Sequence, residues 1–351
     1  MSRINVKNLN KAYKILKGVS GTKGKIVLYK DKLMAVKDNF VVCLDILIQN
    51  PLERTISIEH NFFKTLDNIK SEYIHIDWNN KLAKIENLVF KIDYENYMDI
   101  YKPIDEFISN ETAIMSYSDT IKFCDLYTFV SKEKIRPIIQ HINWNKNIIC
   151  GLDGYRISKK SLSISINGEY NIHGNVAKIL SKLCKKNYVS KFEFNDTHVT
   201  VKLINSNETI ITIFSPLDKS KYINYDSLIR YDQEYDKYIT LSPVLLLNNL
   251  KLVKDNFYKI VKLKFSKDNY IISNSNIGVK VKSENELYNI ENLNNECFEI
   301  YLNYKYLEDA LKTKKGLPYI KIKLNTKISP IYIFSNDDKD VDLILPVRVS
   351  E

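Results

Sequence analysis

Glycine and proline are scarce in this 351-residue chain, which contains 9 glycines and 8 prolines. So few of either residue leaves no long flexible linker of the glycine-rich or proline-rich kind. Hydrophobic residues make up 44% of the chain and charged residues 27%, a balance typical of globular proteins rather than disordered ones. The length therefore suggests two or three domains of ordinary size, each able to bury its own core.

The five cysteines are dispersed, with no Cys-x-x-Cys pair among them. An odd, scattered set argues against a disulfide framework and against a zinc site. No apolar run approaches the roughly 20 residues that a transmembrane helix needs, and the opening MSRINVKNLNK lacks the apolar core of a signal peptide. We therefore expect a cytoplasmic protein with no membrane partner.

Motifs of nucleotide binding and catalysis are also missing. The sequence contains no G-x-G-x-x-G, no G-x-x-x-x-G-K-[ST] and no H-E-x-x-H. Asp153 lies close to Arg156 in the sequence, and we interpret the two as a structural ion pair in a tight turn rather than a catalytic pair. The acidic run at residues 336–342 is interpreted as a solvated loop. The sequence thus predicts a non-catalytic protein without a cofactor or a metal.

The chain does carry a formal net charge of +10. A basic balance in a folded protein favours an anionic partner, either nucleic acid or an acidic membrane surface. A lysine-rich solvated surface explains the same number, so the charge alone leaves both interpretations open.

The order helix, strands, helix, strands occurs three times along the chain. Apolar residues at helical spacing predict six amphipathic helices, at residues 8–18, 60–70, 116–131, 175–186, 241–254 and 303–316. Alternating segments predict strands between them, including residues 136–144 and 161–166. Gly18 is the expected end of the first helix, and Ser242-Pro243 the expected start of the fifth. We predict an α+β fold of three similar domains, at residues 1–104, 105–235 and 236–351.

Lysines recur on the helix faces opposite the apolar stripes. Such faces suit a diffuse contact with phosphates, because lysine is a flexible point charge. Exposed helix faces are usually charged, so for any single helix a solvated surface is the simpler interpretation. The lysines that we predict to face DNA are Lys11, Lys14, Lys17, Lys64, Lys70, Lys178, Lys182, Lys185, Lys251, Lys254, Lys312 and Lys314.

Two segments resemble one known family. Residues 135–158 read IRPIIQHINWNKNIICGLDGYRIS, and the chain closes with LILPVRVSE. Both are similar to the bacterial DNA polymerase III beta subunit, or beta sliding clamp. In that family an Arg-Pro pair opens a strand, a later strand ends in a Thr-Asp-Gly-Tyr-Arg-like run, and the last strand ends in an aliphatic triplet followed by Pro, an aliphatic residue and Arg. The segment LNYKYL at residues 302–307 is similar to the start of a helix in the family's third domain.

This resemblance implies three clamp domains, each with two helices backed by antiparallel sheets. It also implies a head-to-tail homodimeric ring with pseudo-six-fold symmetry that encircles duplex DNA without reading its sequence. Short linear peptides of the replicative polymerase and the clamp loader would bind a hydrophobic pocket between the second and third domains. The matching pocket positions are Ile139, Leu152, Gly154, Tyr155, Arg156, Ile157, Asn303, Tyr306, Ile328, Leu343, Ile344, Leu345, Pro346, Val347 and Arg348.

The chain departs from the family at two places. Leu152 replaces the usual threonine, which makes that wall of the pocket more apolar, and a proline common in the link between the second and third domains is missing near Arg230. These departures leave the peptide preference open. Leu152 and the weak resemblance of the first domain also keep one alternative open, a divergent clamp-like interaction module of a phage or mobile element that does not serve general replication. A third hypothesis, independent of these departures, is a basic enzyme that acts on nucleic acid.

Overall fold

The computed structural model describes residues 2–20, 25–37, 40–46, 48–49, 55–66, 69, 71–77, 80–91, 93–94, 104, 106–206, 208–230, 235, 237–255, 259–266, 269–274, 278–284, 287–291, 297–336 and 338–349. Its contacts divide the chain into two compact units. Unit 1 comprises Met1–Thr120, Ile166–Gly168 and Lys178–Lys219, and unit 2 comprises Ile121–Ser165, Glu169–Ala177 and Ser220–Glu351. The three domains expected from the sequence stay a prediction.

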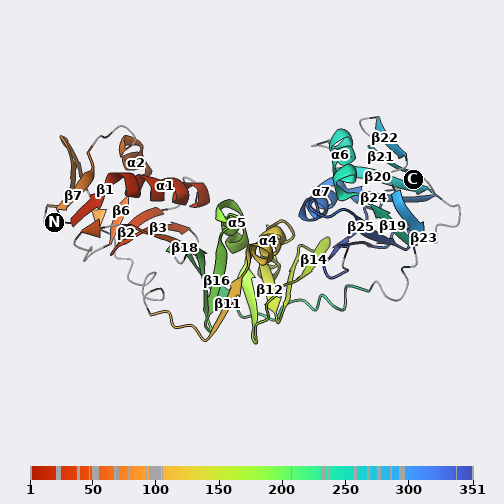
Figure 1. Ribbon diagram of the computed structural model, residues 1–351, viewed down its shortest axis with the longest axis horizontal. Helices are drawn as coiled ribbons and strands as arrows, with labels where there is room; N and C mark the ends of the chain where they lie inside the picture. The colour runs from red at the N-terminus through yellow and green to blue at the C-terminus, as the bar shows by residue number, and fades with distance from the viewer. Residues whose placement is uncertain are drawn as a thin grey trace. The chain divides into compact units, whose positions relative to one another are not determined.

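Two antiparallel sheets build unit 1 (Figure 1). The larger sheet has the order β10 (Asp93–Tyr94), β6 (Ile56–Ile58), β2 (Lys25–Tyr29), β3 (Lys32–Lys37), β4 (Phe40–Asp45), β18 (Glu208–Asp218), β17 (His198–Asn205), β16 (Val189–Phe194) and β11 (Glu111–Met115). The smaller sheet has the order β5 (Ile48–Gln49), β1 (Ser2–Asn5), β7 (Tyr73–Asp77), β8 (Leu82–Ile85) and β9 (Leu88–Lys91).

Unit 2 repeats this plan. Its larger antiparallel sheet has the order β15 (Glu169–His173), β12 (His141–Asn145), β13 (Ile148–Leu152), β14 (Arg156–Ser161), β27 (Val341–Ile344), β26 (Ile331–Phe334), β25 (Ile320–Leu324), β19 (Lys237–Leu241) and β23 (Leu287–Glu291). The smaller sheet has the order β22 (Val279–Glu284), β21 (Asn269–Asn274), β20 (Ile260–Ser266) and β24 (Phe298–Asn303).

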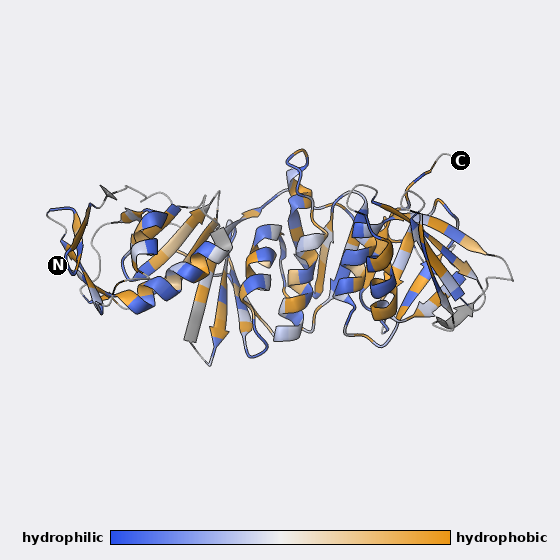
Figure 2. Ribbon diagram, turned by 90° about the horizontal axis from the view of Figure 1, so that it is seen from above, coloured by the Kyte–Doolittle hydropathy of each residue, from blue (hydrophilic) through white to orange (hydrophobic). Residues whose placement is uncertain are grey.

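The six predicted helices are present. They are α1 (Val6–Ser20), α2 (His60–Leu66), α4 (Tyr117–Asp125), α5 (Gly174–Leu183), α6 (Pro243–Val253) and α7 (Tyr304–Thr313). In α1 the apolar residues at helical spacing, Leu9, Ala12, Tyr13 and Leu16, are buried, at 5% exposure or less. Figure 2 shows hydrophobic and hydrophilic residues alternating along the helices and strands, as amphipathic elements require.

Side-chain caps explain where two of the helices begin. The Ser242 hydroxyl accepts a hydrogen bond from the Leu245 N–H at the start of α6, and Pro243 occupies the first helical turn. The Asn303 side chain accepts a hydrogen bond from the Lys305 N–H at the start of α7. The predicted start of α6 is therefore confirmed, and Asn303 has a structural role of its own.

Four details of the predicted element order are wrong. The α1 helix runs past Gly18 to Ser20. Residues 162–166 form no strand, and residues 137–140 form the 3-10 helix η2 before β12 begins. Each repeat also opens with a short strand, namely β1, β11 or β19, and not with a helix. Strands of four or five residues leave a weak signal, and in β11 the exposed Ile114 breaks the apolar alternation.

No helix among the described residues is long and apolar enough to cross a membrane. The same residues contain no group of three or more His, Cys, Asp or Glu side chains placed to hold a metal ion.

Candidate functional site

Arg156 is the centre of the predicted pocket sequence, and it is 6% exposed. Its Nε lies 2.8 Å from Asp153 Oδ2, and its Nη1 lies 2.9 Å from Asp309 Oδ2 on α7. Nη2 donates to the Thr128 carbonyl oxygen. The guanidinium carbon also lies 4.3 Å from the centre of the Tyr306 ring. Because this buried arginine is bound by carboxylates from the turn and from α7, it fixes the start of β14 against α7.

The Asp-Gly-Tyr-Arg run forms a tight turn between β13 and β14. Asp153 Oδ1 accepts from the Tyr155 N–H at 3.0 Å and from the Arg156 N–H at 3.2 Å. Gly154 has φ +93°, a backbone conformation that favours glycine. The structural ion pair predicted for Asp153 and Arg156 is thus confirmed, and the turn leaves Tyr155 60% exposed.

The end of the chain lies beside this turn. Strand β27 pairs with β14, with Ile344 opposite Arg156. Beyond β27 the Leu345 N–H donates to the Tyr155 carbonyl at 2.9 Å, and the Val347 N–H donates to the Tyr301 carbonyl at 2.8 Å. Leu345 is 38% exposed. Two backbone hydrogen bonds therefore hold the Leu-Pro-Val segment and leave its first side chain accessible.

Two stacked tyrosine rings lie next to this segment. The rings of Tyr155 and Tyr306 are stacked, with centroids 6.2 Å apart and an interplanar angle of 23°. Burial raises the pKa of the Tyr306 hydroxyl above its usual value, so the ring stays neutral at physiological pH. Tyr155 and Leu345 are exposed, Tyr306 is half-buried, and the Tyr306 ring lies over the buried guanidinium of Arg156.

The remaining aliphatic pocket positions belong to one buried cluster. Ile139, Leu152, Ile157 and Leu343 are between 3% and 6% exposed. Four further aromatic residues pack with them, namely Tyr222, Tyr235, Tyr332 and Phe334. The sequence reasoning missed these four, although the concentration of tyrosine at residues 222–238 was a usable signal. The aliphatic positions are therefore packed against aromatic rings of the same unit.

Several predicted pocket residues lie apart from this cluster. Ile328 is 66% exposed in the turn between β25 and β26, and its place in the pocket stays a prediction. Arg348 is exposed, and Pro346 and Val347 are half-buried. Ile344 is fully buried in a second cluster with the apolar residues of α6 and α7.

The predicted DNA-facing lysines are mostly exposed, and several have partners. Lys64 Nζ donates to Asn61 at 3.1 Å, Lys182 Nζ to the Gly18 carbonyl at 2.7 Å, and Lys251 Nζ to Asn248 at 3.3 Å. The exposed set is Lys11, Lys14, Lys17, Lys64, Lys182, Lys185, Lys251, Lys254 and Lys312, and Lys178 is half-buried. Lys70 lies outside the described residues.

Lys314 is wrongly placed in that set. It is 3% exposed and pairs with the buried carboxylate of Asp342. A second buried pair lies near it, since Lys160 Nζ is 2.8 Å from Asp125 Oδ2. Burial raises the pKa of the Asp125 carboxyl, while the Lys160 ammonium opposes that shift. A buried lysine whose charge is paired with a carboxylate cannot contact a phosphate of DNA, so Lys314 has a structural role.

Glu308 offsets the positive charge of two lysines in this set, Lys254 and Lys312. Its carboxylate lies 2.9 Å from Lys305 Nζ, 3.1 Å from Lys312 Nζ and 3.9 Å from Lys254 Nζ. Burial tends to raise the pKa of the Glu308 carboxyl, but hydrogen bonds from Lys305 and Lys312 bring it below its usual value. Glu308 is therefore ionised at neutral pH and offsets part of the positive charge of α6 and α7.

Solved structures with the same fold define the class of protein. A protein of Eubacterium rectale assigned as a DNA polymerase III beta subunit superposes with a TM-score of 0.81 and 18% identity, covering 99% of both chains. The DNA polymerase sliding clamp of Bacillus subtilis superposes with a TM-score of 0.77 and 22% identity, again covering 99% of both chains. The chain thus has the sliding-clamp fold from end to end.

A curated relative agrees with this class. The beta sliding clamp of Bacillus subtilis strain 168 is 27% identical over 231 residues, and the match covers 62% of this chain and 59% of the length of that relative. No family model matches the sequence. The resemblance to the bacterial DNA polymerase III beta subunits that the sequence motifs indicated is confirmed by these comparisons.

Proposed function

We propose that this protein is a DNA sliding clamp, a non-catalytic processivity factor that encircles duplex DNA and tethers a replicative polymerase. The observation that carries the proposal is the likeness to sliding clamps over 99% of the chain. The work of such a protein is mechanical, and it needs a closed ring, a basic inner surface and a binding site for partners. A place in the replisome, at the nucleoid in the cytoplasm, would follow from that work.

The proposed partner site is the surface of Tyr155, Tyr306 and Leu345. Its exposed apolar side chains suit a short peptide of the polymerase or the clamp loader, anchored by leucine or phenylalanine. Arg156 lies beneath the surface and fixes the turn that presents Tyr155. Leu152, where the family has threonine, is buried among aromatic rings and so adds apolar packing behind this surface.

The proposed DNA contacts are the exposed lysines of α1, α2, α5, α6 and α7. Lysine neutralises phosphates without reading bases, which is what a protein that slides along DNA needs. Glu308 offsets part of this charge. A weaker positive electrostatic potential at this surface favours mobile contacts with DNA over fixed ones.

The proposed assembly is a head-to-tail homodimeric ring. Strand β9 ends the smaller sheet of unit 1, and strand β22 ends the smaller sheet of unit 2. Leu88 and Val89 of β9 are 44% and 58% exposed. Edge strands with exposed apolar side chains are suited to pairing with another chain, and different edges on one chain allow a heterologous contact that closes into a ring.

A peptide-binding experiment tests the partner site. We expect a fluorescein-labelled pentapeptide with leucine and phenylalanine anchors to bind. Tyr306→Ala should weaken the affinity for this peptide at least tenfold, because the stacked pair of Tyr155 and Tyr306 is lost. Tyr319→Ala removes a tyrosine that is 40% exposed outside the site and serves as the matched control. Fluorescence anisotropy measures both. Equal affinity of the two variants would contradict this site.

The interaction module without a replication role remains distinguishable from the clamp. Binding of the pentapeptide at this site, combined with no retention of the protein on circular DNA, would support the interaction module. A cleaved plasmid, with cleavage abolished by one carboxylate substitution, would instead indicate an enzyme acting on nucleic acid.

A further inference from the structure

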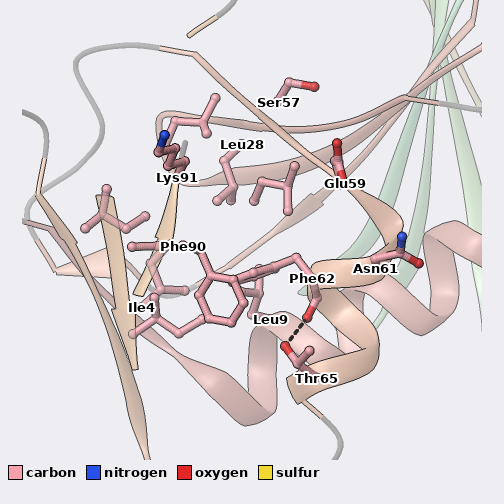
Figure 3. Close-up of a pocket in the computed structure, with 15 residues that line it drawn as sticks. Ile4, Leu9, Leu28, Ser57, Glu59, Asn61, Phe62, Thr65, Phe90 and Lys91 are labelled. Carbon is pink, nitrogen blue, oxygen red and sulfur yellow. Dashed lines mark hydrogen bonds between the residues drawn. The ribbon is translucent and has the colours of Figure 1, made fainter. Parts of the chain in front are cut away.

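Unit 1 contains a cavity of about 420 Å³ beside α2 (Figure 3). Strands of both sheets and the helices α1 and α2 contribute to its walls. The apolar lining consists of Ile4, Leu9, Leu28, Ile56, Ile58, Phe62, Ile74, Ile76, Ala83 and Phe90. None of these residues belongs to the proposed peptide or DNA surfaces.

The walls are part of the interior of the unit. Ile4, Leu28 and Ile56 are 1% exposed or less. Phe62 and Phe90 are half-buried and meet edge to face, with ring centroids 4.9 Å apart and an interplanar angle of 85°. Figure 3 shows these two rings and Leu28 gathered around the cavity. The walls therefore offer aromatic and aliphatic contacts on several sides.

Few polar groups reach the cavity, and the charged ones lie at its mouth. Glu59, Asn61 and Lys91 line it and are exposed. Thr65 also lines it, but its hydroxyl donates to the Phe62 carbonyl at 2.6 Å, so it offers no free hydrogen to the cavity. Among the described lining residues, Glu59 and Lys91 carry opposite charges, and these two charges cancel.

We propose that this cavity binds a neutral, mostly apolar small molecule with a single polar group. Ligand pockets of about 300–1,000 Å³ are lined mainly by apolar and aromatic side chains with a few polar groups, as this one is. Water fills such a space poorly, because a buried water needs two to four polar partners. The cancelling charges of Glu59 and Lys91 give no advantage to an ionic ligand. The inference does not rest on the proposed clamp function.

Two matched fluorescent probes test this proposal on the full-length protein. N-phenyl-1-naphthylamine is neutral and apolar, and 1-anilinonaphthalene-8-sulfonate has the same ring skeleton with an added sulfonate. We expect the neutral probe to bind saturably at one molecule per chain and to raise the melting temperature. We expect the sulfonate to bind at least tenfold more weakly.

Substitutions from two walls locate the binding. Thr65→Leu and Ala83→Leu each fill part of the cavity, and each should weaken binding of the neutral probe at least tenfold. Thr313→Leu on α7 is the matched control, because Thr313 is also half-buried and its hydroxyl also donates to the carbonyl three residues earlier, at 2.9 Å. Circular dichroism checks that each variant is folded.

Three outcomes would overturn the proposal. They are the absence of saturable binding to the wild-type protein, equal affinity of Thr65→Leu and Thr313→Leu, and equal affinity for the two probes. Ala83→Leu keeps the test decisive if Thr65→Leu fails to fold.

Discussion

Arg156 connects the turn before β14 to α7 through buried ion pairs with Asp153 and Asp309. Removing one partner of a buried ion pair typically costs about 3–5 kcal/mol, because an uncompensated charge remains in the interior. Asp309 keeps a second partner, since Lys305 Nζ lies 3.1 Å from its Oδ1, but Asp153 has no other ion pair among those described. The guanidinium therefore contributes to stability as well as to the shape of the proposed peptide site.

We expect Arg156→Met to lower the free energy of unfolding by about 3 kcal/mol, the lower end of the range for a broken buried ion pair. Arg156→Lys should recover only part of this loss, because an ammonium cannot reproduce the forked contacts with Asp153 and Asp309. Arg348→Met is the control, and as an exposed position it should change stability by less than about 0.5 kcal/mol. Urea denaturation measures all three. An Arg156→Met protein as stable as the wild type would contradict the role given to this residue.

At the scale of elements, Glu308 of α7 makes the stability of the α6–α7 pair depend on pH. Its pKa is lowered in the folded protein, so its ionic contacts stabilise the fold above its unfolded pKa of about 4.3. That contribution is lost as the pH falls through the lower folded pKa. We expect Glu308→Gln to lower the urea midpoint at pH 7, and the difference from the wild type to shrink as the pH falls below the unfolded pKa. Glu133→Gln, at an exposed glutamate, should match the wild type throughout this pH range.

The lysines on α5 and just after it test the proposed DNA surface. Replacing Lys178, Lys182 and Lys185 with glutamine should weaken DNA binding and reduce the slope of log affinity against log salt by up to about 0.9 for each lost phosphate contact. The control is the triple substitution of the exposed lysines Lys219, Lys221 and Lys327. Anisotropy with labelled duplex DNA between 50 and 200 mM salt, a range over which about 10³–10⁵ in affinity can be lost, gives the slopes. Unchanged slopes in the α5 variant would remove this helix from the DNA surface.

The helices were predictable from the sequence because each carries several apolar residues at helical spacing. The stripe from Leu9 to Leu16 in α1 is one example. The opening strands β1, β11 and β19 were not predictable, since four or five residues rarely show enough alternation. The segment 161–166 shows the opposite error, because its serines alternate with leucine and isoleucine as in a strand, whereas the structure forms no strand at residues 162–166.

The candidate site was predictable in part. The turn at Asp153–Arg156 followed from local chemistry, and its ion pair is present. The partner Asp309 was not predictable, since it lies 153 residues away and its charge resembles that of any helix surface. The prediction that Lys314 faces DNA was wrong for the same reason, because only the fold reveals that Lys314 pairs with Asp342 in the interior.

For the whole molecule, the net charge of +10 has a consistent interpretation in the proposed clamp. Exposed lysines on several helices supply the positive charge, while buried lysines such as Lys160 and Lys314 are neutralised by carboxylates. A surface charge of this kind attracts DNA without fixing the protein at one sequence. Topological linkage in a closed ring would then hold the protein on DNA where the electrostatic contacts are weak.

Retention on circular DNA tests this claim most directly. The labelled protein is loaded by a bacterial clamp loader onto a nicked circular plasmid, separated from free protein by gel filtration in high salt, and then treated with an enzyme that cuts the plasmid once. We predict that it stays on the circle and is released when the circle is cut. Equal retention on circular and linear DNA, or no retention on either, would contradict the account.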